Sequence, residues 1–259
     1  METAMEPEDT PFPPPQRGSS VARRELFPAT QWSAISMARH GDESKAVEGL
    51  RRLAVNYWRP LYLYLRKRGE GHEDASDSVQ SFFEFVFSSG FFSHVDREGG
   101  KFRSYLLRSL ERWRSRRFVK DGAQKRGGQV THVPLDGVEE MEDAPAISDD
   151  IEPEVAFDRQ WASDMVGRAV EATRNDYVRR DRGLWFETLS PGLPGGGALR
   201  PYVELADVLG CSEGAVKKAA FDLRKAFASH LKAEIRSTVQ TNEDAEEELR
   251  YLVSVMSGR

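Results

Sequence analysis

The sequence predicts an all-α protein made of two small helical domains that are joined by an acidic flexible linker. Apolar residues recur at helical spacing in most of the chain, and no segment shows the alternation of a strand. The 259 residues suffice for two modest cores. The predicted parts are a proline-rich disordered tail (1–28), a first domain (29–128), the linker (129–155), a second domain (156–236) and a helical extension (237–259).

Three helical stretches are predicted in the first domain. The first covers 30–69, where Pro60 is compatible with a break between two helices. The second covers 73–87 and has an apolar face opposite a polar one. The third covers 101–120. The polar face of the second stretch consists of Asp77, Gln80 and Glu84, at spacing i, i+3 and i+7, and by spacing alone it is also typical of a solvated helix surface.

Charge is sorted into blocks, although the formal net charge is only −5. Residues 97–128 hold eleven Lys and Arg against three acids, whereas 134–164 hold eleven acids against one arginine. On the third helix, arginines repeat every four residues, at Arg108, Arg112 and Arg116. A helix so rich in arginine indicates a nucleic-acid surface more than a solvated face. Trp113 is in register with the apolar stripe of this helix, which favours the core over base stacking.

The second domain carries a helix-turn-helix pattern over 201–225. A short helix is expected to end at Gly210, and Ser212 is expected to cap the next one. Basic side chains remain on the outer faces of that second helix. Its inward positions are Val216, Ala219, Ala220, Leu223 and Phe227, and its basic outer residues are Lys217, Lys218, Arg224 and Lys225. This pattern alone also occurs in many unrelated proteins.

Residues 243–256 predict a C-terminal helix with acids crowded at its start. Its apolar stripe is expected to consist of Leu249, Leu252, Val253 and Met256. Two interpretations stay open at this point. The helix is either a cap on the second domain or a brake whose acids cover basic residues that contact DNA.

Several kinds of function are not expected. Cys211 is the one cysteine, so no internal disulfide forms, and the scattered histidines show no metal-site spacing. The glycine-rich run at 190–197 lacks both the following Lys-Ser/Thr and the preceding strand of a phosphate-binding loop. No stretch reaches membrane-spanning length. We therefore expect no enzymatic activity, no metal, no cofactor, no membrane partner and a cytoplasmic location.

Three segments, in order, resemble extracytoplasmic-function sigma factors of bacterial RNA polymerase, particularly the planctomycete-like group. Residues 30–87 (TQWSAISM to FFEFVF) and 102–128 (FRSYLLRSLERWRSRRFVKDGAQKRGG) resemble the family's region two. Residues 201–235 (PYVELADVLGCSEGAVKKAAFDLRKAFASHLKAEI) resemble its promoter-reading region four. The proline-rich tail has no counterpart in the family pattern.

The resemblance implies a non-enzymatic factor that directs core RNA polymerase to promoter DNA, with an anti-sigma factor or another regulator as a further partner that the family allows. Polymerase docking falls on Asp77, Gln80, Phe83 and Glu84. Contacts to the minus-ten element fall on Phe91, Phe92, Lys101, Arg103, Arg108, Arg112, Arg116, Arg117 and Lys120. Reading of the minus-thirty-five element falls on Glu213, Lys217, Lys218, Arg224 and Lys225.

Two other functions remain open. A helix-turn-helix regulator would bind DNA by itself, usually as a dimer. A protein-interaction module would use the charged blocks to bind proteins and never DNA. Binding of DNA without polymerase would distinguish the regulator from a sigma factor. Co-purification with core polymerase would distinguish a sigma factor from the interaction module.

Overall fold

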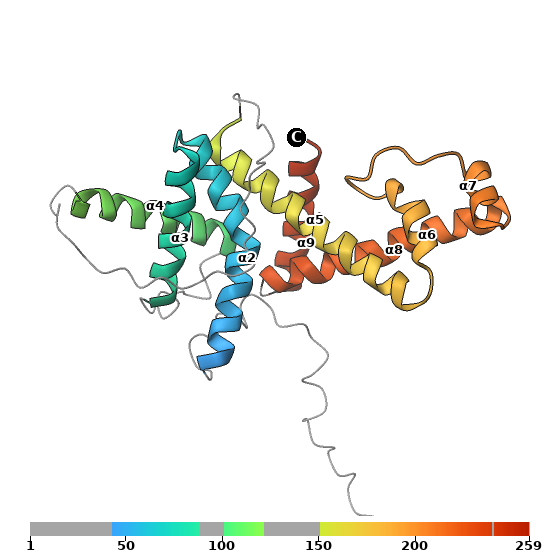
Figure 1. Ribbon diagram of the computed structural model, residues 1–259, viewed down its shortest axis with the longest axis horizontal. Helices are drawn as coiled ribbons and strands as arrows, with labels where there is room; N and C mark the ends of the chain where they lie inside the picture. Colours follow the sequence, from blue (N-terminus) through green and yellow to red (C-terminus); the bar gives the residue numbers. More distant parts are fainter. Residues whose placement is uncertain (1–42, 89–100, 122–150, 240, 259) are drawn as a thin grey trace, which may run out of the picture.

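The computed structural model describes residues 43–88, 101–121, 151–239 and 241–258, and in these ranges its regular structure is entirely helical (Figure 1). The all-α prediction is therefore confirmed for this part of the chain. None of the described helices combines the length and the apolar composition that a membrane span requires. The elements are α2 (Glu43–Lys67), α3 (His72–Ser88), α4 (Phe102–Asp121), α5 (Pro153–Arg179), α6 (Gly183–Leu189), the 3-10 turn η2 (Ser190–Gly192), α7 (Tyr202–Leu209), α8 (Glu213–Thr238) and α9 (Asn242–Met256).

α2 continues through Pro60, so the break with which this proline was compatible does not occur. A proline inside a helix removes one hydrogen bond and crowds the preceding turn, at a cost of about 3 kcal/mol. Residues 61–65 that follow it are all buried, which means that α2 is covered on every side there. Each fully buried large apolar side chain contributes about 1.5–3 kcal/mol. Burial of this segment therefore outweighs the cost of the proline.

α5 packs against helices from both ends of the molecule (Figure 1). Its buried residues recur from Ala156 to Tyr177, and its most extensive contacts are with α2 and α8. One continuous hydrophobic core consequently runs from α2 through α5 to α8. α5 begins at Pro153, within the range predicted as linker. The division into two domains stays a prediction, because most of 129–155 lies outside the described residues.

Aromatic side chains join α2, α3 and α4. Each such pair contributes about 0.5–1.5 kcal/mol beyond the area that it buries. Trp113 is half-buried within this group, in agreement with its predicted place in the apolar stripe of the helix. The pairs, with the distances between ring centroids, are Trp58 and Phe83 (6.1 Å), Tyr57 and Phe102 (5.4 Å), and Phe82 and Trp113 (5.7 Å).

We predict that Met165→Ala lowers the free energy of unfolding by about 2–5 kcal/mol, because Met165 is fully buried in α5. Since α5 shares one core with α2 and α8, unfolding in urea should remain a single transition. Far-UV circular dichroism and tryptophan fluorescence should give the same midpoint. Val155→Ala, at an exposed position of α5, serves as the control. Two separate transitions would show that the two ends of the molecule fold independently.

Candidate nucleic-acid interface

α7 and α8 are joined by a short turn in the segment predicted as a helix-turn-helix, and both predicted boundaries are confirmed. Gly210 ends α7 in the left-handed conformation, with φ 62°, which glycine adopts without a steric penalty. The Cys211 amide then donates to the Ala206 carbonyl at 3.1 Å. The Ser212 hydroxyl accepts a hydrogen bond from the Ala215 amide at 3.3 Å and so caps α8.

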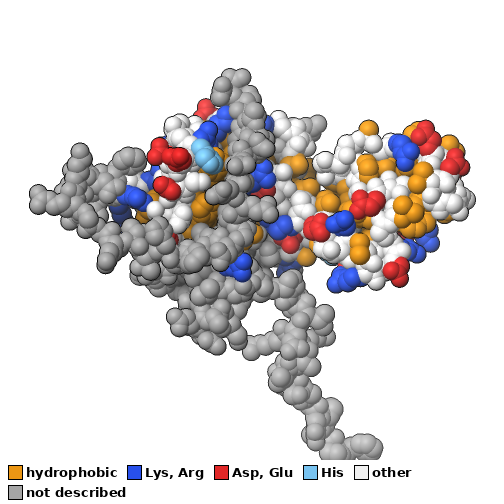
Figure 2. Space-filling view, in the orientation of Figure 1, with side chains coloured by type: hydrophobic (Ala, Val, Ile, Leu, Met, Phe, Trp, Pro, Cys, Tyr) orange, Lys and Arg blue, Asp and Glu red, His pale blue; other side chains and the backbone are white. Residues whose placement is uncertain are grey.

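The two faces of α8 follow the predicted pattern. Its buried residues include Val216, Ala220, Leu223 and Phe227, and Ala219 is half-buried. The basic residues are all exposed, namely Lys217, Lys218, Arg224 and Lys225. Figure 2 shows charged and hydrophobic side chains interspersed on the visible face at this end of the molecule. The first turns of α8 therefore offer cations to solvent while the opposite face is fixed in the core.

The basic residues of α8 differ in their partners. Lys217 Nζ lies 2.7 Å from Glu213 Oε1, and the hydrogen bond and charge of Glu213 raise the pKa of Lys217. Arg224 donates to the Tyr202 hydroxyl at 3.4 Å. Lys218 and Lys225 make no ion pair with any residue that the structure describes. Glu213 thus orients Lys217, and two lysines remain open to an anion.

Phe221 is a surface residue of α8 to which the sequence analysis gave no role. It is 64% exposed and lies one turn from both Lys217 and Lys225. Its position off the inward spacing of α8 was the available signal. An exposed phenylalanine beside lysines is suited to apolar contact with a thymine methyl group in the major groove.

α4 carries an exposed row of arginines. Arg108, Arg112 and Arg116 face solvent, and no described carboxylate pairs with them. Arg117, also predicted to bind DNA, stacks on Trp113 at 5.2 Å from the ring centroid. The Lys120 side chain, Phe91 and Phe92 lie outside what the structure describes.

Arg114, on the same helix, is set apart from this row. It pairs with Glu70 and is only 14% exposed in its side chain. It therefore connects α4 to the turn that follows α2. Arg114 lies between Arg112 and Arg116 in the sequence. The residue type is the same, and only the carboxylate partner distinguishes Arg114 from the exposed row.

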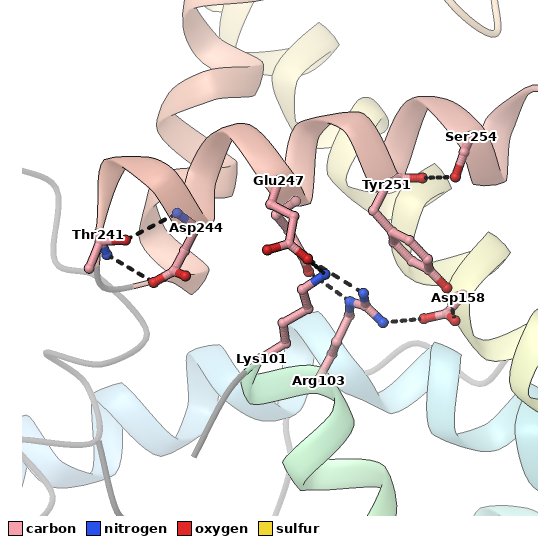
Figure 3. Close-up of polar contacts among 9 residues, drawn as sticks. Lys101, Arg103, Asp158, Thr241, Asp244, Glu247, Tyr251 and Ser254 are labelled. Atoms are coloured by element: carbon pink, nitrogen blue, oxygen red, sulfur yellow. Dashed lines mark hydrogen bonds and ion pairs between the residues drawn. The ribbon is translucent and has the colours of Figure 1, made fainter. Parts of the chain in front are cut away.

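Lys101 and Arg103, at the start of α4, point toward α9 and do not continue the exposed row (Figure 3). Arg103 is 7% exposed, and its Nε donates to Glu248 at 2.7 Å. Its second nitrogen, Nη1, donates to Asp158 of α5 at 2.8 Å. Lys101 Nζ lies 3.0 Å from Glu247 and 3.2 Å from Glu248. The predicted role of Arg103 in direct DNA contact does not fit its burial here.

Aromatic rings complete this ionic cluster. The Arg103 guanidinium lies 4.2 Å from the centroid of Tyr251 and 4.9 Å from that of Trp161. Burial acts to lower the pKa of Arg103, but the hydrogen bond and charge of Glu248, together with Asp158, outweigh it and raise that pKa. Burial, and then the hydrogen bond to Asp158, raise the pKa of Tyr251 to about 12. The guanidinium therefore stays charged, and the phenol stays protonated at neutral pH.

α9 presents a different face to the protein from the one predicted. Val253 and Met256 of the predicted stripe are 54% and 43% exposed, whereas Glu248 is 1% exposed. Leu252 is buried as expected. The stripe prediction is thus wrong in part, because pairing with Arg103 turns the acid inward.

The first turn of α9 is closed by a capping box. The Thr241 hydroxyl accepts from the Asp244 amide at 3.0 Å, and the Thr241 amide donates to the Asp244 carboxylate at 3.4 Å (Figure 3). This reciprocal pair provides acceptors for two backbone amides at the point where the helix begins. The start of α9 is therefore fixed by its own residues.

The predicted docking residues of α3 lie at different depths. Asp77 is exposed, and the Gln80 amide donates to Glu84 at 3.3 Å on the same side of the helix. Phe83 is buried and stacks on Trp58. The polar residues can meet a partner directly, whereas Phe83 can act only by supporting α3 from beneath.

Comparison with protein-family models, curated proteins and solved structures found no match to this chain. The helix-turn-helix, the arginine row and the ionic cluster are therefore interpreted from their own residues.

We predict that Ser212→Ala lowers the free energy of unfolding by about 1 kcal/mol, since the Ala215 amide loses its capping acceptor. Ser212→Asp should retain most of the stability. Ser229→Ala, at an exposed position within α8, is the matched control and should be neutral or slightly stabilising. Thermal unfolding of the three variants measures the difference, and equal melting temperatures for Ser212→Ala and Ser229→Ala would rule out the cap.

Proposed function

We propose that this chain is a sigma factor of bacterial RNA polymerase, which directs the enzyme to promoters and helps to open the DNA. The observation that carries the proposal is that one chain offers two cationic helical surfaces, the arginine row of α4 and the outer face of α8 in a helix-turn-helix. The segment resemblance described above assigns these same helices to the two promoter elements.

The first surface suits DNA opening. Arg108, Arg112 and Arg116 repeat at one-turn spacing and can follow a strand of phosphates, which positions DNA without reading its sequence. Aromatic residues that stack on extruded bases contribute about 1–3 kcal/mol for each base. In the proposed function Phe91 and Phe92 supply that stacking.

The second surface suits reading of duplex DNA. An α-helix fits the major groove, and the residues near its start contact base edges. Glu213, Lys217 and Lys218 occupy the first turns of α8, so they are assigned to bases. Arg224 and Lys225 lie further along the helix and are assigned to phosphates.

Docking on the polymerase is assigned to the exposed side of α3. Asp77 is free to meet a partner, and the hydrogen bond between Gln80 and Glu84 orders the side chains next to it. Phe83 contributes through its packing on Trp58.

The proposal includes two domains that lie apart on the promoter. The minus-ten and minus-thirty-five elements are roughly 80 Å apart along straight B-DNA, at about 3.4 Å for each base pair. The segment 129–152 has 24 residues and can extend to about 80 Å. A linker at this place therefore has the required reach, and binding to the polymerase would have to compensate the lost contacts between α2 and α5.

A stand-alone regulator is the second candidate, because a helix-turn-helix can bind an operator by itself. Free sigma protein should bind duplex DNA weakly, since the net charge of −5 opposes approach of a polyanion. Tight binding of the full chain to a promoter duplex at physiological salt, without polymerase, would favour the regulator.

We predict that the full chain supports run-off transcription by core RNA polymerase and that Arg108→Gln, Arg112→Gln and Arg116→Gln together abolish promoter opening. Opening is followed by permanganate reactivity of unpaired thymines. The control variant carries Arg159→Gln, Arg180→Gln and Arg182→Gln, which removes the same charge from exposed positions elsewhere. Absence of any transcript with the unmodified chain on a panel of promoters, or equal opening by both variants, would contradict the proposal.

We predict that Lys225→Ala weakens binding to all promoters alike, whereas Lys217→Ala and Glu213→Ala mainly relax sequence preference. Each lost phosphate contact should also reduce the slope of log K against log salt by about 0.9. Competition binding of the reconstituted holoenzyme to intact and scrambled minus-thirty-five sequences measures both effects. If every variant lost the same affinity for both sequences, α8 would not be reading bases.

A further inference from the structure

The C-terminal helix α9 occupies two of the cations that were predicted to contact DNA. Glu247 and Glu248 lie 3.0 and 3.2 Å from the Lys101 amine, and Glu248 accepts from Arg103 at 2.7 Å (Figure 3). These contacts join the start of α4 to residues 145 positions later in the sequence. Glu247 and Glu248 therefore neutralise charge on Lys101 and Arg103 at the start of α4.

The groups that α9 contacts on α4 are suited to phosphate as well as to carboxylate. Guanidinium groups bind carboxylate and phosphate with the same paired geometry. Lys101 also lies at the very start of α4, since its carbonyl accepts from the Ser104 and Tyr105 amides at 3.1 and 3.2 Å. The positive end of a helix dipole adds to the attraction for an anion there. A nucleic-acid phosphate can thus replace the acids of α9 without a change in the chemistry of the site.

α9 is held both by ion pairs and by apolar contacts. Burying Arg103 with Glu248 removes both charges from water, which costs more than packing apolar residues of similar volume. Leu252 is buried and Leu249 and Val255 pack partly buried against the core, whereas Val253 and Met256 are exposed. The apolar face thus holds α9 on α5 and α8, and the ion pairs hold it on α4. The ion pairs with α4 are the contacts that another anion can replace.

We propose that α9 is an internal acidic competitor for nucleic acid, whose Glu247 and Glu248 cover Lys101 and Arg103 until an incoming phosphate strand displaces them. The inference rests on the proposed function only in assigning α4 to DNA. α9 has its own capping box, so the start of this helix does not depend on contacts with α4. The result is a free protein in which the start of α4 has reduced affinity for DNA.

The test uses the full chain without polymerase and a fluorescent single-stranded oligonucleotide as the probe. Glu247→Gln is the main variant, because Glu247 is 59% exposed and its loss leaves the buried pair of Arg103 and Glu248 intact. Glu246→Gln, one position away and exposed, is the matched control for charge. Both variants are also made with Lys101→Gln, so that the coupling of Lys101 with each acid is measured by a double-mutant cycle.

We predict that Glu247→Gln raises the affinity for the oligonucleotide about two- to five-fold over the Glu246→Gln control, the factor expected for one exposed ion pair. In the Lys101→Gln background the two variants should bind alike. Hydrogen exchange of the α9 amides should become faster when the oligonucleotide is added to the unmodified chain.

The proposal that α9 competes with nucleic acid would be overturned by equal oligonucleotide affinities of Glu247→Gln and Glu246→Gln. It would also be overturned if the oligonucleotide left the hydrogen exchange of the α9 amides unchanged. Neither measurement involves polymerase. A chain that fails in run-off transcription but shows this coupling refutes the sigma proposal alone, and a chain that transcribes but lacks the coupling refutes the competitor alone.

Discussion

Burial of α5 between α2 and α8 is the contact around which the described helices are arranged. The apolar residues of α5, such as Trp161 and Met165, face the continuous core. Its polar residues fasten the neighbours of that core, since Asp158 binds Arg103 of α4, and Arg168 donates to Glu234 of α8 at 2.9 Å. A displacement of α5 would therefore disturb α4, α8 and α9 together.

The polar contacts of α5 extend to its C-terminal half. Asp176 lies 2.8 Å from His230 of α8 and also pairs with Arg179. The hydrogen bonds from Arg179 and His230 lower the pKa of Asp176, although burial opposes them. Stability from this carboxylate is present above its ordinary pKa and is lost as the pH falls through the lowered value. Because Asp176 is close to the surface, solvent screens the pair, and its contribution is small.

The carboxylate partners distinguish the cations that hold the fold together from those that remain exposed. Arg103 and Arg168 each bind a carboxylate on another helix, and Arg114 binds Glu70 in the turn between α2 and α3. Arg108 and Lys218, in contrast, pair with no carboxylate among the described residues. A net charge of −5 thus coexists with described surfaces on which cations have no carboxylate partner.

The helices and the helix-turn-helix could be predicted because their signals are local. Helical spacing, Gly210 at the end of α7 and Ser212 at the start of α8 depend on residues within a few positions of one another. The continuation of α2 through Pro60 could not be predicted in this way. The free-energy cost of the proline is local, but the burial that compensates it comes from helices distant in sequence.

The candidate site was predicted less completely for the same reason. Arg103 and Arg108 look alike in the sequence, and the contacts of Arg103 with Asp158 and Glu248, both far along the chain, are what distinguish them. Likewise, the inward turn of Glu248 could not be inferred from an acidic run, since a buried acid needs a partner that local spacing does not reveal.

The long sequence separation of the bond between Arg103 and Glu248 has a consequence for the order of folding. Closing a loop of 145 residues costs about 2 kcal/mol more in chain entropy than closing one of ten residues. During synthesis, at about 5–20 residues per second, Glu248 is added roughly 7–30 s after Arg103. Until Glu247 and Glu248 have been added, Lys101 lacks both of its carboxylate partners and Arg103 has only Asp158.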